Sequence, residues 1–113
     1  MTKIKFFKDR DVFVGFEVTG HTGYADFGED VLCSAISSLT QGIVLGITKV
    51  CEINANVVKD DDRGYLKVEL PNRLDQNKQD NVQVLLKTLF VSLEDLVSGY
   101  SNYISMEVIG NVY

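Results

Sequence analysis

The chain has 113 residues, of which 45% are hydrophobic and 24% are charged, and its formal net charge at pH 7 is -5. A chain of this length can bury one core without disulfides or metals, so we expect a single domain over residues 1–113. The negative charge argues against a protein that holds nucleic acid through its phosphates, because that mode needs a basic surface. The same charge is compatible with a basic polypeptide partner.

The compartment follows from the termini and the cysteines. No apolar run approaches the ~18 residues that span a bilayer, and Met1-Thr2-Lys3-Ile4-Lys5 lacks the apolar core of a signal peptide. Cys33 and Cys51 lie in one predicted helix, roughly 27 Å apart if it is continuous, so they cannot form a disulfide within the chain. We therefore expect a cytoplasmic protein without membrane contact, and with one histidine and no Cys-x-x-Cys spacing we expect no metal or cofactor.

The chain begins with a predicted β-hairpin. Its strands are Ile4–Phe7 and Val12–Val18, and a polar turn at residues 8–11 joins them. A helix is expected from about Asp30 to Val50, because apolar residues recur there three or four positions apart and form one stripe. The stripe consists of Leu32, Ile36, Leu39, Ile43, Ile47 and Val50.

Two glycines, Gly42 and Gly46, lie inside this helix. Each costs about 1 kcal/mol relative to alanine, and the usual reason to tolerate glycine in a helix is the close approach of another backbone. We expect that neighbour to be the sheet or a second copy of the chain.

The second half of the chain repeats the strand-strand-helix order. Strands are predicted at Ile53–Val58 and Tyr65–Leu70, and the polar stretch Asn72–Asp80 is predicted to be a loop. A second amphipathic helix runs from about Val82 to Gly99, and a last strand covers Ile104–Ile109. The predicted fold is therefore α+β with the order ββαββαβ, an antiparallel or mixed sheet with two helices packed on one face.

The segment Gly20–Cys33 carries the residues that suggest chemistry. It contains His21, the only histidine, and ends at Cys33 near the predicted helix start. A thiol in that position beside an imidazole is pushed toward the reactive thiolate. Backbone N–H groups without partners at the helix start are candidates to hold the oxyanion that forms when a thiolate attacks a carbonyl. Glu29 and Asp30 oppose part of this effect, because they compete for the helix start and their charge disfavours a thiolate.

Other residues of this segment have a structural and a functional interpretation. Gly20, Gly23 and Gly28 fit turns that need unusual backbone angles, and they also fit a loop that opens for a peptide. Asp30 is expected to cap the helix by accepting an N–H from Leu32 or Cys33, and a role in orienting His21 is the alternative.

Two further side chains also have two interpretations each. Ser37 lies one helical turn after Cys33, where it either lines the site or is buried and bonds back to the Cys33 carbonyl. Tyr24 and Phe27 form either a wall for an apolar substrate side chain or ordinary loop packing.

The same segment resembles the signature of the ribosomal-processing cysteine protease family, small bacterial proteins once catalogued only as a domain of unknown function. Thr22 and Ser34 stand where alanine is usual in that signature. The signature positions that match are Gly20, His21, Gly23, Tyr24, Ala25, Gly28, Asp30, Cys33, Ala35 and Ser37.

The resemblance implies an endopeptidase that removes a short N-terminal extension from a protein of the large ribosomal subunit. It implies that His21 is the general base and Cys33 the nucleophile. It also implies a homodimer with a mobile glycine-rich loop beside the site. Residues that would support the site or bind substrate are Gly20, Gly23, Tyr24, Asp30 and Ser37.

Two other classes of function remain open. A ribosome-associated module without chemistry would use the glycine loop and the helix start to grip a peptide. An acylphosphatase-like enzyme ranks last, because its phosphate cradle needs an arginine and Gly20–Gly28 contains none.

Overall fold

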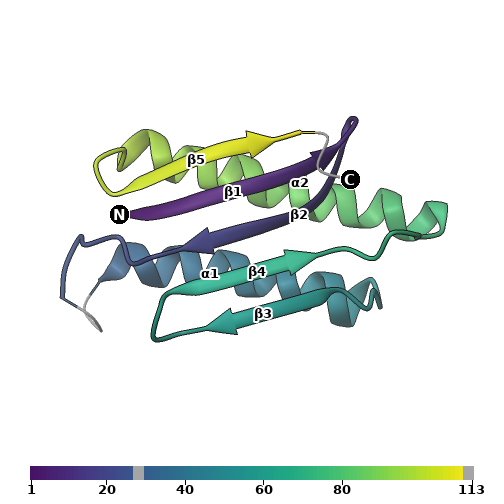
Figure 1. Cartoon of the computed structure of the whole chain (residues 1–113), viewed down its shortest axis with the longest axis horizontal. Helices are drawn as coiled ribbons and strands as arrows, with labels where there is room; N and C mark the ends of the chain where they lie inside the picture. The colour runs from purple at the N-terminus through teal and green to yellow at the C-terminus, as the bar shows by residue number, and fades with distance from the viewer. Residues whose placement is uncertain (27–29, 111–113) are drawn as a thin grey trace.

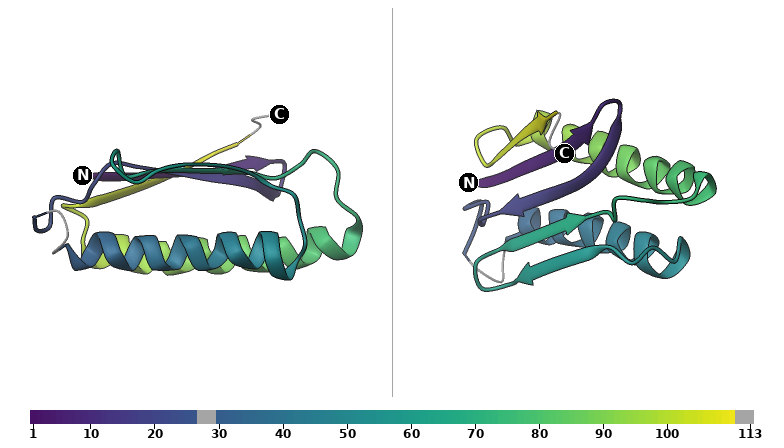
Figure 2. Two further views of the ribbon diagram at one scale, coloured as in Figure 1. Left: turned by 90° about the horizontal axis from the view of Figure 1, so that it is seen from below. Right: turned by 45° about the vertical axis from the view of Figure 1, so that its right-hand side comes forward.

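The computed structural model describes residues 1–26 and 30–110, so the expectations for Phe27, Gly28 and Glu29 lie outside the described residues. Two helices cover one face of a five-stranded sheet (Figures 1 and 2). The elements are β1 (Thr2–Asp9), β2 (Val12–Thr19), α1 (Val31–Leu45), the π-helix η1 (Gly46–Val50), β3 (Asn56–Asp60), β4 (Tyr65–Glu69), α2 (Gln76–Gly99) and β5 (Ile104–Ile109). The predicted order and fold class are confirmed.

The sheet is mixed, with the strand order β3-β4-β2-β1-β5. All neighbouring strands are antiparallel except β1 and β5, which are parallel. Helix α2 connects β4 to β5. At the end of β2, Thr19 pairs with Tyr65, the first residue of β4. The loop that follows β2 therefore leaves the sheet directly beside the β3–β4 turn.

The core fills the layer between the sheet and the two helices. Phe6 lies at its centre, fully buried, with ring contacts to Phe13, Phe16 and Phe90. The helices contribute the predicted apolar stripes, of which Leu32, Ile36, Ile47, Val82, Leu86, Leu89 and Leu93 are buried. Burial of one face of each helix fixes both of them against the sheet.

The start of α2 differs from the prediction. The helix begins at Gln76, inside the stretch Asn72–Asp80 that was predicted to be a loop. Asp75 caps it by accepting a hydrogen bond from the backbone N–H of Lys78 at 2.8 Å. The first turn is polar and carries no apolar stripe, so the periodicity pattern missed it, whereas the aspartate cap was a readable signal.

The environment of Gly46 also differs from the expectation, whereas a second copy of the chain beside Gly42 stays a prediction. Gly46 lies against the side chain of Leu85 from α2, since a Cβ built on Gly46 would be 3.1 Å from its Cδ1. A Cβ on Gly42 would meet no described atom within 4 Å. Gly46 therefore serves close packing of the two helices, through a side chain rather than a backbone, and Gly42 faces open space.

Contrary to the expectation that no apolar run approaches the length of a membrane span, the segment Val31–Val50 has the length and composition of a helix that could cross a membrane, with a mean hydropathy of 1.6. Core helices of soluble proteins pass the same test. Here Leu32, Ile36 and Ile47 of this segment are part of the core between helices and sheet.

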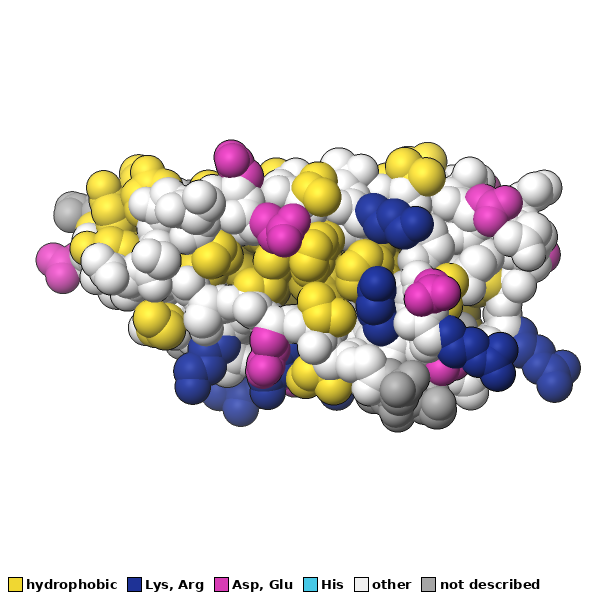
Figure 3. All heavy atoms as spheres, turned by 90° about the horizontal axis from the view of Figure 1, so that it is seen from above, with side chains coloured by type: hydrophobic (Ala, Val, Ile, Leu, Met, Phe, Trp, Pro, Cys, Tyr) yellow, Lys and Arg dark blue, Asp and Glu magenta, His cyan; other side chains and the backbone are white. Residues whose placement is uncertain are grey.

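The edge of the molecule along β5 and α2 leaves hydrophobic side chains exposed between scattered charges (Figure 3). Val108 of β5 is 46% exposed, and Val84 and Val91 of α2 are 64% and 57% exposed.

Candidate active site

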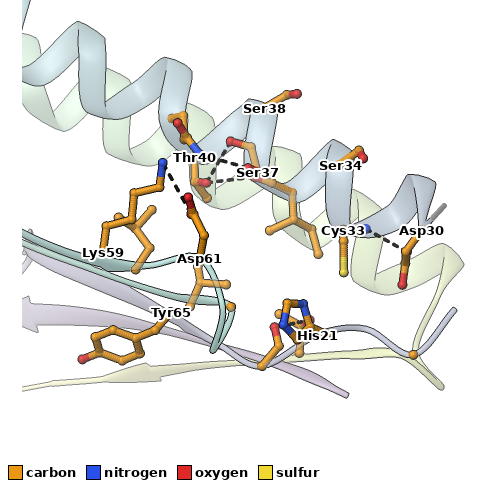
Figure 4. A pocket seen from close by; sticks show the side chains of 18 of the residues that line it. His21, Asp30, Cys33, Ser34, Ser37, Ser38, Thr40, Lys59, Asp61 and Tyr65 are labelled. Atoms are coloured by element: carbon orange, nitrogen blue, oxygen red, sulfur yellow. Dashed lines mark hydrogen bonds and ion pairs between the residues drawn. The ribbon is translucent and has the colours of Figure 1, made fainter. Parts of the chain in front are cut away.

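A cavity of about 560 Å³ lies between α1 and the sheet, at the end where β2 leaves the sheet and the β3–β4 turn begins. His21 and Cys33 both line it. Figure 4 shows the sulfur of Cys33 pointing from α1 toward the side of the cavity that carries the His21 ring. The two residues identified from the sequence, 12 positions apart, are thus brought to one cavity by the fold.

The loop after β2 places His21 against the β3–β4 turn. Gly20 has a φ of +91°, and its N–H donates to the carbonyl of Gly64 at 3.0 Å. The Nε2 of His21 lies 3.2 Å from the carbonyl oxygen of Asp62. A carbonyl oxygen only accepts, so Nε2 carries the proton in this hydrogen bond and Nδ1 is the basic nitrogen of the neutral ring.

Gly64 makes this close approach possible, and the sequence analysis did not single it out. Its φ is +61°, and a Cβ there would be 2.9 Å from the carbonyl oxygen of Gly20 and 3.1 Å from Cε1 of His21. The sequence signal for this position was a glycine at the end of the polar turn 60–64, which is typical of a backbone with positive φ. Its partner could not be read from the sequence, because Gly20 and Gly64 are far apart along the chain.

Cys33 lies in the first turn of α1 with its side chain half-buried. The backbone N–H of Thr22 donates to its Sγ at 3.3 Å, and the Sγ lies 3.5 Å from the hydroxyl of Thr22. Thr22 was noted in the sequence only as a departure from the family signature. In the structure, both the backbone and the side chain of Thr22 contact the sulfur.

Asp30 is the cap of α1, as expected. Its Oδ1 accepts the N–H groups of Leu32 and Cys33 at 3.0 and 2.9 Å. Its Oδ2 accepts the Thr22 hydroxyl and the N–H of Tyr24, the latter at 3.1 Å. Burial alone would raise the pKa of this carboxyl, but the hydrogen bonds from Thr22 and Cys33 outweigh it and lower the pKa to about 2.

The same hydrogen bonds correct one expectation. The sequence suggested that backbone N–H groups at the start of α1 are available to hold an oxyanion. Two of these groups, from Leu32 and Cys33, are already bonded to Asp30. These two groups are therefore not available to an oxyanion while Asp30 accepts from them.

The remaining predicted site residues divide into two groups. Gly20, Gly23 and Ser37 line the cavity. Ser37 is exposed and its Oγ accepts a hydrogen bond from Gln41 at 3.0 Å, so the alternative of a buried serine is wrong. Tyr24 is not among the residues that line the described cavity, and its ring packs edge-on against Tyr103 at 5.2 Å and against Tyr100 at 5.8 Å.

Comparison with known proteins gives consistent results. The chain matches the sequence profile of the family described as cysteine protease Prp over residues 1–105. A relative from Bacillus subtilis (strain 168), named ribosomal processing cysteine protease Prp, is 28% identical over 89 residues, which are 79% of this chain and 80% of the relative.

Solved structures share the fold. A crystal structure of the essential ribosomal processing protease Prp from S. aureus, in complex with a covalently linked product peptide, has a TM-score of 0.85 at 19% identity and covers 96% of this chain and 99% of that chain. A crystal structure of a protein from Streptococcus mutans has a TM-score of 0.83 at 24% identity, and covers 97% of this chain and 95% of that chain.

The lowered pKa of Asp30 predicts a loss of stability in acid. Because the folded pKa is about 2 and the ordinary value is 3.8, the charged carboxylate stabilises the fold above pH 4, and this stabilisation is lost as the pH falls toward 2. We expect Asp30→Asn to reduce the free energy of unfolding at pH 7 by about 2 kcal/mol, and the difference from the unsubstituted protein to shrink below pH 4. Urea unfolding between pH 7 and 2 measures this. Asp95→Asn, at an exposed position of α2, is the control. A difference independent of pH would contradict the assignment.

The close approach at Gly64 predicts a specific effect on His21. Gly64→Ala should lower the free energy of unfolding by about 1–3 kcal/mol, because alanine is strained at a positive φ, and should shift the NMR signal of His21 Hε1, which is unique in this chain. Gly99→Ala is the matched control, since its Cβ would meet no described atom within 4 Å. An unchanged Hε1 signal in Gly64→Ala would show that the turn does not position the ring.

Proposed function

This chain belongs to the cysteine protease Prp family, and on that basis we propose that it is an endopeptidase that removes a short N-terminal extension from a large-subunit ribosomal protein. The observation that carries the proposal is that His21 and Cys33 line one cavity. The volume of this cavity, about 560 Å³, lies within the ~300–1,000 Å³ that is usual for ligand sites.

The proposed reaction uses Cys33 as nucleophile and His21 as general base. Nδ1 of His21 takes the thiol proton, and the sulfur attacks the carbonyl carbon of the scissile peptide bond. The C–N bond then breaks, the leaving amine takes the proton from the imidazolium, and a thioester links the substrate's N-terminal part to Cys33. A water molecule, deprotonated by His21, hydrolyses the thioester and restores the thiol.

The surroundings of His21 support its role as base. The carbonyl of Asp62 accepts the Nε2 proton, so this hydrogen bond holds the tautomer in which Nδ1 is free of a proton and able to accept one. The orienting group is thus a main-chain carbonyl of the β3–β4 turn, whereas the sequence analysis considered only the side chain of Asp30. The Asp30 hydrogen bonds described above serve the helix start and the loop instead.

Relatives support the choice of substrate. The Bacillus subtilis relative is named a ribosomal processing protease, and the S. aureus structure contains a covalently linked product peptide. The net charge of -5 suits a basic polypeptide such as a ribosomal protein tail. We place the reaction in the cytoplasm, where the free thiols of Cys33 and Cys51 are stable, and we propose no direct contact with nucleic acid or membrane.

We also propose that the protein is a homodimer. The exposed apolar residues Val84 and Val91 of α2 and Val108 of β5 support association through these two elements. Sedimentation velocity should give the mass of a dimer at micromolar concentration, and a monomer at all concentrations would contradict this.

The catalytic assignment predicts the behaviour of three variants. Cys33→Ala should reduce kcat for a peptide that contains the substrate's N-terminal extension by at least about a thousandfold, because the nucleophile is lost. His21→Ala should reduce it by about 10²–10⁴-fold. Cys51→Ala is the matched control and should cleave normally, because Cys51 lies beyond α1 at the end of η1.

Mass spectrometry of the peptide products measures all three. Cleavage by Cys33→Ala at the normal rate would eliminate the protease proposal. If the unsubstituted protein and all variants bind the peptide but none cleaves it, the result would favour the alternative of a ribosome-associated peptide-binding module.

A further inference from the structure

Thr22 occupies a buried position between the His21 loop and the start of α1, with 2% of its surface exposed. Its hydroxyl donates to Oδ2 of Asp30 and accepts the N–H of Tyr24 at 3.3 Å. The same oxygen lies 3.5 Å from Sγ of Cys33, which acts as the donor in that contact. The one proton and both lone pairs of the hydroxyl are therefore in use.

The direction of these hydrogen bonds depends on Asp30. Since the pKa of this carboxyl is lowered to about 2, it is ionised at neutral pH and can only accept. The Thr22 hydroxyl proton is therefore held by Asp30, and Cys33 faces a lone pair of the Thr22 oxygen. The S–H of Cys33 donates to that lone pair, so the hydroxyl holds the thiol in one orientation.

Other groups around the sulfur do not depend on the Thr22 side chain. The backbone N–H of Thr22 donates to Sγ at 3.3 Å and would remain with any residue except proline at this position. The titratable and charged groups that line the same cavity are His21, Asp30, Lys59, Asp61 and Tyr65. A change of the Thr22 side chain keeps these residues, and Thr22→Val replaces the hydroxyl by a methyl group of similar size. Both Thr22→Ala and Thr22→Val also remove the hydrogen bond that Thr22 donates to Asp30.

We propose that the Thr22 hydroxyl is a positioning group that restrains the Cys33 thiol by accepting a hydrogen bond from its S–H, and that this restraint slows the reaction of the sulfur with electrophiles. This restraint is a property of threonine at this position, and alanine, the usual residue of the family signature, lacks it. The inference relies on the proposed function only in taking Cys33 as the nucleophile.

The test is the rate at which iodoacetamide alkylates Cys33, measured by peptide mass spectrometry in the full-length protein with Cys51 as internal reference. We expect Thr22→Ala and Thr22→Val to be alkylated about fivefold faster at pH 7, the factor equivalent to one ordinary hydrogen bond of ~1 kcal/mol. Thr22→Ser retains the hydroxyl and should restore the original rate.

Three results decide the proposal. Alkylation of Thr22→Ala at the original rate or more slowly would overturn it, and so would a Thr22→Ser variant as fast as Thr22→Ala. A variant with a loosened fold would show faster alkylation of Cys51 as well. If Thr22→Val shows this, the proposal is judged on Thr22→Ala, provided that its Cys51 is alkylated at the original rate. Peptide cleavage is measured separately, so faster alkylation without any cleavage would reject the protease function while supporting the role of Thr22.

Discussion

The carboxylate of Asp30 is the interaction on which the geometry of the site depends. One oxygen caps α1 through Leu32 and Cys33, and the other holds the loop after β2 through Thr22 and Tyr24. A buried carboxylate with these donors is far more stable charged than protonated, so it stays ionised at neutral pH. One side chain thus fixes both the helix that carries the sulfur and the loop that carries the imidazole.

The second anchor comes from the other half of the chain. The β3–β4 turn approaches the loop after β2 because β4 pairs with β2, and Gly64 lets the two backbones come together. The carbonyl of Asp62 then holds one nitrogen of His21. The imidazole of His21 is therefore positioned by the pairing of β2 with β4, whereas Cys33 is positioned by α1.

Thr22 contacts the sulfur in two ways. Its backbone N–H donates to Sγ of Cys33, and its hydroxyl accepts a hydrogen bond from the thiol. A helix start occupied by its own aspartate cannot offer the same N–H groups to an oxyanion. The structure therefore differs from the expectation at this point: α1 carries the sulfur, and the N–H groups of Leu32 and Cys33 serve the helix cap.

The sequence by itself determined the order of the elements and the segment Gly20–Ser37, because apolar periodicity and helix capping act between residues that are neighbours along the chain. It also predicted the cap at Asp30, and it missed the cap at Asp75 because the polar first turn of α2 carries no stripe. Only the tertiary structure decided that Asp62 and Gly64 position His21 and that Thr22 contacts the sulfur. The contact between His21 and Asp62 joins residues 41 positions apart, and the contact between Thr22 and Cys33 joins the two sides of a loop. Such contacts are set by strand order and packing, which leave no local pattern in the sequence.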